Sequence, residues 1–245
     1  MRKIIVWRWA SFVVGMMILS LGITMTIKGQ RLGVGPWDVL HIGLYRNFEL
    51  SIGTWGIILS IIIVVATAAV LRQWPKFGTW LNLLLIGLFI DLFNWLIPDI
   101  SSMTGQVIIF TLGIVVMAYG VGIYVAPNLG AGPRDSLMLI FSEKLGFSIK
   151  KVRTSIEVIV AIAGWLLGGP VGIGTVIIAL LIGQIVHYSL PQCRKLLAKL
   201  AGADEAQIMG LVQSTVHPTK EIGENVPKHV DMNETVEHTA VGSKN

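Results

Sequence analysis

The sequence predicts an all-helical integral membrane protein. Hydrophobic residues make up 53% of the chain and charged residues 13%, with a mean hydropathy of +0.73. Soluble domains carry about 25% charged residues, so most of this surface does not face water. Apolar stretches of roughly 18 to 24 residues recur, each long enough to cross a hydrocarbon core of about 30 Å. They are expected to be helical, because helices satisfy their own backbone polar groups in lipid.

The apolar stretches divide the chain into a membrane domain and a tail. Six spans are predicted, at 5–27, 52–71, 78–97, 107–126, 152–168 and 172–190. The first is basic and then apolar, and it is too long for a cleaved signal peptide. Residues 1–190 thus form the membrane domain, and 191–245 form a cytoplasmic tail. Within the tail, 191–200 are expected to form a short surface helix. The polar segment 217–245 is expected to be largely disordered.

Basic residues predict the orientation of the spans. With the N-terminus inside, the outside segments hold Lys28, Arg31 and Arg46 as their basic residues. The inside segments hold many more, at positions 2, 3, 72, 76, 134, 144, 150, 151, 194, 195 and 199. Cytoplasmic loops of membrane proteins are enriched in Lys and Arg, so both termini are expected in the cytoplasm of a bacterial cell, with the lipid bilayer as the main partner.

An internal repeat organises the membrane domain. The segment 32–38 (LGVGPWD) returns as 129–135 (LGAGPRD), and matched glycines precede and follow both copies in the same order. Such ordered similarity indicates duplication of a unit covering about 5–97 and again about 107–190. Each unit holds three spans, so the second enters the membrane from the opposite side. The prediction is an inverted three-plus-three repeat.

The two LGxGPxD segments, each followed by apolar spans, resemble the YczE/YitT group of bacterial integral membrane proteins. The resemblance covers about residues 5–190. It implies a multi-pass protein of the bacterial plasma membrane, and it carries no established molecular activity. YitT-type members have a folded cytosolic domain after their spans. The tail here is too short and polar for one, so the chain is closer to the YczE type.

The repeated motif predicts two short helices, at about 36–46 and 133–145. Its glycines permit close backbone approach, its proline suits the first helical position, and its aspartate meets the positive end of the helix dipole. One interpretation is a pair of re-entrant half-helices that form a solute site. The other is a pair of helices lying along the interfaces, each capped by its own aspartate. The candidate solute-binding residues of the motif are Gly33, Gly35, Pro36, Asp38, Gly130, Gly132, Pro133 and Asp135.

Polar residues inside the predicted spans add three candidates. Asp91, His187 and Glu157 are included because ionisable groups in lipid are unfavourable unless they serve a function. The alternatives are interfacial positions for Asp91 and His187 and a structural Arg153–Glu157 pair at i,i+4 spacing. Asn82 and Gln184 are expected to form hydrogen bonds between helices.

Other chemistry finds little support in the sequence. It holds no Ser/His/Asp elbow, no phosphate-binding loop and no metal-ligand spacing around its single Cys193, so neither catalytic nor metal residues are predicted. No cofactor is expected, and in a membrane protein the formal charge of +5 does not indicate nucleic acid. The leading hypothesis is transporter-like or channel-like permeation of a small solute or proton. The alternatives are a non-transport accessory or regulatory membrane protein and, more remotely, an intramembrane enzyme. The partners considered besides lipid and solute are a second copy of the chain and another membrane protein.

Overall fold

The computed structural model describes residues 2–72, 74–130, 132–134, 137–138, 141, 146–147 and 149–203, the side chains of 71, 149 and 150 excepted. Regular secondary structure within these ranges is helical throughout. The elements are α1 (Arg2–Lys28), η1 (Gln30–Leu32), α2 (Pro36–Phe48), α3 (Ile52–Leu71), α4 (Phe77–Leu96), α5 (Met103–Val125), α7 (Ile149–Leu166) and α8 (Ile173–Ala201). Most of the predicted second short helix, 133–145, and the tail beyond 203 lie outside the described residues.

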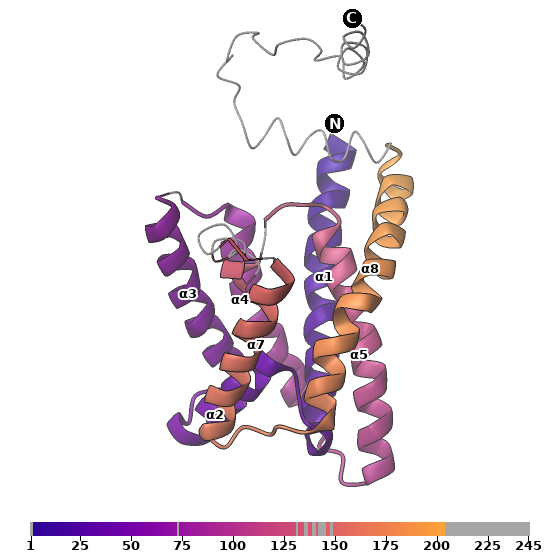
Figure 1. The fold of residues 1–245 in the computed structure, drawn as a ribbon. Coiled ribbons are helices and arrows are strands. Elements are labelled where there is room, and N and C mark those ends of the chain that lie inside the picture. Colours follow the sequence, from indigo (N-terminus) through magenta and orange to yellow (C-terminus); the bar gives the residue numbers. More distant parts are fainter. Residues whose placement is uncertain are drawn as a thin grey trace, which may run out of the picture.

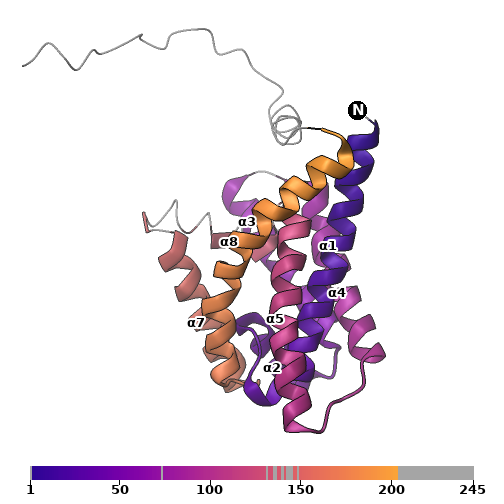
Figure 2. The same cartoon turned by 90° about the vertical axis from the view of Figure 1, so that its right-hand side faces the viewer.

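The helices form one bundle with two kinds of member (Figures 1 and 2). Long helices run its height, with α1 packed along α5, α4 against α1, and α8 against α5. The shorter α2 packs between α3 and α7 and occupies one half of that height. The start of α1 and the end of α8 lie at the same end of the bundle, where Lys3 approaches Gly202.

Five helices of the described chain are long and apolar enough to cross a membrane: α1, α3, α4, α5 and α8. These correspond to five of the six predicted spans. The sixth, predicted at 152–168, is α7. It has 18 residues and carries Lys150, Lys151, Arg153 and Glu157. Because of these charged residues, α7 is not among the five helices that are apolar enough to cross a membrane.

Local signals in the sequence account for where several helices begin. Ser51 accepts a hydrogen bond from the Thr54 backbone N–H at the start of α3, and Ser102 accepts one from Gly105 at the start of α5. Side-chain oxygens at this position satisfy backbone donors that the first helical turn leaves unpaired. Helix α2 begins at Pro36, where a missing N–H is tolerated.

The contact between α1 and α5 depends on small residues. A Cβ at Gly22 would overlap the backbone of Met117, and a Cβ at Gly120 would overlap the backbone of Leu19. The helix axes can therefore approach more closely than larger side chains would allow. Around this contact lies the main core, which includes the fully buried Phe12 and Met16 of α1.

Helix α8 extends further than the sequence predicts. Its span was expected to end at 190, with a separate surface helix at 191–200, but the helix continues through Pro191 to Ala201. Cys193, Leu197 and Ala201 are buried on this extension and pack with Ile4 and Trp7 of α1. Tertiary burial therefore sustains the helix across a residue that disfavours it.

Candidate functional site

Two loops, one containing Gly33 and the other Gly130, each pack against the opposite half of the chain. Gly33, which adopts φ +98°, lies against α8, and a Cβ there would stand 2.6 Å from the Thr175 hydroxyl. Gly130 lies against the start of α4, and a Cβ there would stand 2.9 Å from the Thr79 nitrogen. Each loop thus rests on the first turn of the other half's last helix. Gly33 needs its left-handed backbone and both loops need the missing side chain, so these two glycines serve packing.

Helix α2 enters the interior of the bundle with its first two turns. Pro36, Trp37, Asp38 and His41 are buried, whereas the last turn exposes Phe48. The helix is held against α7 at its far end, where the Asn47 amide donates to the Leu167 carbonyl at 2.8 Å. The amino-terminal end of α2, with its partial positive charge, therefore lies among other helices.

A cavity of 280 Å³ lies at that amino-terminal end and is lined from both halves of the chain. Its apolar lining comes mainly from α1, α5 and α8 and includes Leu19, Ile23, Met117, Val121, Ile178 and Ile182. Its polar residues, called the polar wall below, include Trp37, Asp38, Asn82, Arg134, Arg153 and Glu157. The lining thus combines hydrocarbon with charged and polar groups.

Three residues of the polar wall are buried, and each has one polar atom without a hydrogen-bond partner. Trp37 is 8% exposed, Asp38 5% and Asn82 3%. In the part of the chain that the structure describes, Nε1 of Trp37, Oδ1 of Asp38 and Nδ2 of Asn82 have no hydrogen-bond partner. Nδ1 of His41, 2% exposed, lies 3.5 Å from that Asp38 oxygen, which is longer than an ordinary hydrogen bond. Unpaired buried polar atoms are rare in proteins, and three of them belong to residues that line this one cavity.

The charges of the polar wall form two arrangements. The Arg134 guanidinium lies over the Trp37 indole, with Cζ 4.7 Å from the ring centroid, in cation–π geometry. On α7, Nε of Arg153 donates to Oε1 of Glu157 at 3.0 Å, the pair expected from their i,i+4 spacing. Asp38, Glu157, Arg134 and Arg153 bring two carboxylates and two guanidinium groups to the lining, so their formal charges cancel.

The structure brings together several of the predicted candidates. Gly35, Pro36, Asp38, Gly132 and Glu157 line the cavity. Pro133 is buried next to this group, and Asp135 lies outside the described residues. The motif therefore supplies both the loop that joins the halves and part of the cavity wall.

Two candidates lie elsewhere. Asp91 binds the start of α3, accepting hydrogen bonds from the Gly53 N–H at 2.8 Å and from the Ser51 hydroxyl. His187 is exposed on the outer face of α8, with its ring 5.6 Å from that of Tyr188. Neither lines the cavity. In this arrangement Asp91 caps a neighbouring helix, and His187 occupies the bundle's outer surface.

Sequence reasoning did not assign Asn82, Trp37 or Arg134 to the candidate site. Asn82 was expected to bond to another helix, but it lines the cavity, and its buried amide nitrogen has no hydrogen-bond partner in the described structure. Trp37 and Arg134 stand at equivalent places in the two motif copies, and this difference between copies was a signal that could have pointed to them.

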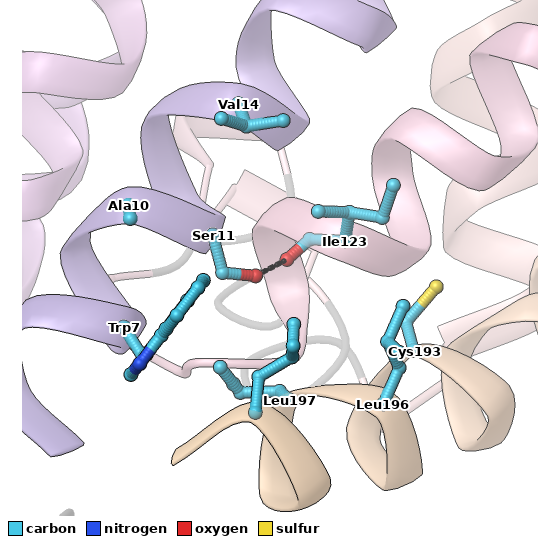
Figure 3. A pocket seen from close by; sticks show the side chains of 9 residues that line it. Trp7, Ala10, Ser11, Val14, Ile123, Cys193, Leu196 and Leu197 are labelled. Carbon is cyan, nitrogen blue, oxygen red and sulfur yellow. Dashed lines mark hydrogen bonds between the residues drawn. The ribbon is translucent and has the colours of Figure 1, made fainter.

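A second pocket has different chemistry (Figure 3). It measures 200 Å³ and lies between the start of α1, the end of α5 and the extension of α8. Trp7, Val14, Leu196 and Leu197 line it, and the Ser11 hydroxyl beside it donates to the Ile123 carbonyl at 3.0 Å. Because the Ser11 hydroxyl already donates to a backbone carbonyl, the surface that this pocket presents is mainly apolar.

Comparison with known proteins agrees with the membrane character of the fold. The chain is 46% identical over 197 residues to "Uncharacterized membrane protein YczE" of Bacillus subtilis, covering 80% of this chain and 92% of that protein. It is 30% identical over 181 residues to YyaS of the same organism, covering 73% and 90%. It is 35% identical over 173 residues to an uncharacterized protein of Haemophilus influenzae, covering 71% and 78%.

Solved structures give no match to the chain. A family model does match, over residues 6–191, which span both motif copies and the cavity. Together with the similarity to YczE, this match shows that the chain belongs to the family of unknown function DUF6198 and is a multi-pass membrane protein of the YczE type.

Proposed function

We propose that this protein is a permeation protein of the bacterial plasma membrane, similar to a secondary transporter or a channel, and that a small solute passes through its central cavity. The observation that carries the proposal is the cavity itself. It is lined by both halves of the chain, and its polar wall holds three buried groups with unpaired atoms. Transporters built from repeats place their solute sites in this position, between the repeats and beside the ends of short helices.

The proposal includes six spans, with α7 as the sixth. Its 18 residues give a length of about 27 Å at 1.5 Å per residue, close to the hydrocarbon thickness. Arg153 and Glu157 line the cavity and pair with each other. Charged residues in spans are tolerated where they face such an interior, which supports a membrane-spanning α7 in spite of its charge.

Reciprocal contacts support an inverted repeat. Gly22 packs on Met117, and the equivalent residues Gly120 and Leu19 pack on each other in turn. Such exchange is expected when a pseudo-twofold axis relates the two halves.

The motif loops repeat this exchange at a second place. Gly33 rests on Thr175, while its equivalent, Gly130, rests on Thr79, and Thr79 and Thr175 are themselves equivalent in the repeat. The buried first turns of α2 favour a re-entrant half-helix over one lying along the interface.

The proposed orientation has both termini in the cytoplasm. The start of α1 and the end of α8 share one end of the bundle, as an even number of crossings requires. Lys3 stands in the first turn of α1, and Arg194, Lys195 and Lys199 stand near the end of α8. An excess of Lys and Arg is typical of the cytoplasmic side.

Transport of an unidentified solute can be tested with a mixture. The purified full-length protein is reconstituted in liposomes, and a filtered small-molecule extract of bacterial cells is added outside. Mass spectrometry then compares the solutes that enter these liposomes with those that enter protein-free ones. At least one solute should enter faster with the protein, and Asp38→Asn should remove that difference while His187→Gln retains it. Equal entry of every solute with and without protein would contradict the proposal.

The accessory-protein hypothesis makes a different prediction about the interior. A protein that only holds a partner through its spans would be expected to have a tightly packed apolar centre. Unpaired groups on Trp37, Asp38 and Asn82 would destabilise such a protein without benefit, since each unpaired buried polar group costs about 1–3 kcal/mol. The permeation hypothesis gives these residues a role, and we therefore favour it.

A further inference from the structure

We infer that the solute of the central cavity is a small zwitterion with an apolar side chain, of the chemical class of a free aliphatic amino acid. This inference rests on the proposed permeation function and specifies its solute. It follows from the unpaired atoms of the polar wall, from the balance of charge among the described lining residues and from the apolar residues of the same lining. Each of these observations excludes a different class of small molecule.

The Asp38 carboxylate calls for a cationic donor. Its Oδ1 makes no hydrogen bond within the described structure and lies 3.5 Å from Nδ1 of His41, whose ring is positive only when protonated; Asp38 is 5% exposed. An ionised carboxylate only accepts hydrogen bonds, and a buried charge is unfavourable until an opposite charge is added. A ligand ammonium supplies both the donor and the charge. A hydroxyl group would supply the donor alone.

The neighbouring groups call for an acceptor. Nε1 of Trp37 and Nδ2 of Asn82 are N–H donors, both buried and both without a partner among the described residues. Arg134 lies over the same Trp37 ring and adds positive charge beside it. A ligand carboxylate supplies acceptors for such donors and a charge opposite to that of Arg134, and hydrogen bonds to charged groups are stronger than those between neutral groups.

The overall charge of the lining favours a ligand whose own charges cancel. Among the described residues of the lining, the formal charges of Asp38, Glu157, Arg134 and Arg153 sum to zero. A simple cation or a simple anion would leave a net charge buried among the helices, which is unfavourable in a low-dielectric interior. A zwitterion keeps the balance and still satisfies both kinds of group.

The apolar lining sets the remainder of the ligand. Leu19, Ile23, Val121 and Ile182 present hydrocarbon to the cavity. A sugar or polyol would bury hydroxyls there without partners. The volume of 280 Å³ falls just below the range of about 300–1,000 Å³ for drug-sized ligands, so a small metabolite fits.

Binding to the full-length protein in lipid nanodiscs tests the inference, with calorimetry as the measurement. The probes are L-leucine, 4-methylpentanoate (which lacks the ammonium), 3-methylbutylamine (which lacks the carboxylate) and sorbitol. Leucine should bind, each single-charge probe should bind roughly tenfold to a hundredfold more weakly, and sorbitol should not bind. Asp38→Asn should lower leucine affinity to that of 4-methylpentanoate and leave 4-methylpentanoate itself unchanged. His187→Gln is the control, and thermal unfolding confirms that each variant is folded.

Equal binding of leucine and 3-methylbutylamine would overturn the inference in favour of a cation site, and binding of sorbitol in preference to leucine would overturn it in favour of a polyol site. Absence of binding by all four probes to folded protein would also overturn it. The liposome experiment distinguishes these failures from failure of the proposed function. If extract solutes cross but leucine does not bind, the zwitterion inference falls alone. If leucine binds with the stated pattern but no solute crosses, permeation falls and a zwitterion-binding site remains.

Discussion

The Arg134 guanidinium lies over the indole ring of Trp37, with Cζ 4.7 Å from the ring centroid. The two residues occupy equivalent positions in the two copies of the repeated motif, so the copies meet at this point. At the same position one copy therefore supplies an aromatic face and the other a cation. Both also line the cavity, so the two motif copies contribute different chemistry to the candidate site.

This contact should give a measurable coupling energy. In a double-mutant cycle with Trp37→Leu and Arg134→Met, we expect a coupling of about 0.5–2 kcal/mol in the free energy of unfolding, the range for cation–π pairs. Trp37→Phe should retain part of it, because an aromatic face remains. Denaturant unfolding in detergent provides the measurement, and strictly additive single effects would contradict the pairing.

The close contact between α1 and α5 should tolerate no added carbon. Gly22→Ala and Gly120→Ala each place a Cβ on the backbone of the other helix, so each should destabilise the protein by roughly 1–3 kcal/mol or more. Gly183→Ala in α8 is a matched control, because a Cβ there meets nothing within 4 Å. Melting temperatures of the three variants measure the effect, and equal melting of Gly22→Ala and Gly183→Ala would contradict the packing.

Asp91 and Asp38 should respond differently to substitution. Asp91→Ala removes the acceptor for the Gly53 N–H and the Ser51 hydroxyl, so we expect a loss of stability of about 0.5–2 kcal/mol and unchanged solute binding. Asp38→Asn keeps the shape of the side chain but removes its charge from the cavity, so it should weaken binding with little loss of stability. Melting curves and leucine calorimetry on both variants test this separation. Loss of binding in folded Asp91→Ala protein would return Asp91 to the site.

The proposed orientation can be tested by reporter fusions. A reporter that is active only in the cytoplasm should give signal when fused after Lys199 and none when fused after Asp99. The physical reason is the excess of Lys and Arg on one side of the predicted topology. Signal at Asp99 and silence at Lys199 would reverse the orientation.

Much of the helical framework could be predicted from the lengths of the apolar stretches and from the residues that mark where helices begin. Helices α3 and α4 fall within a residue of their predicted bounds, because Ser51 marks one start and Pro75 precedes the other. The continuation of α8 through Pro191 could not be predicted in this way. It depends on burial of Cys193 and Leu197 against another helix, which is a tertiary effect.

The candidate site was predictable in part for the same physical reason. Proline and glycine signals placed Asp38 at the start of a short helix that lines the cavity. They could not show that Asn82, more than 40 positions away, would face the same space, because an almost uniformly apolar helix gives no strong periodicity to indicate which face turns inward. Nor could they distinguish a binding role for Asp91 from a capping role, which depends on the position of α3.

If a solute permeates through the cavity, the cavity must be reachable by water from both sides of the membrane. Because Cys193 is the one cysteine of the chain, Cys193→Ser gives a background for single cysteines. Ile182→Cys places a thiol on the cavity wall, and Phe12→Cys places one in the packed core as a control. A membrane-impermeant thiol reagent is then applied to right-side-out and to inside-out vesicles. A permeation protein predicts labelling at position 182 in both vesicle types and none at position 12. Labelling at 182 from one side alone, or from neither, would contradict permeation through this cavity.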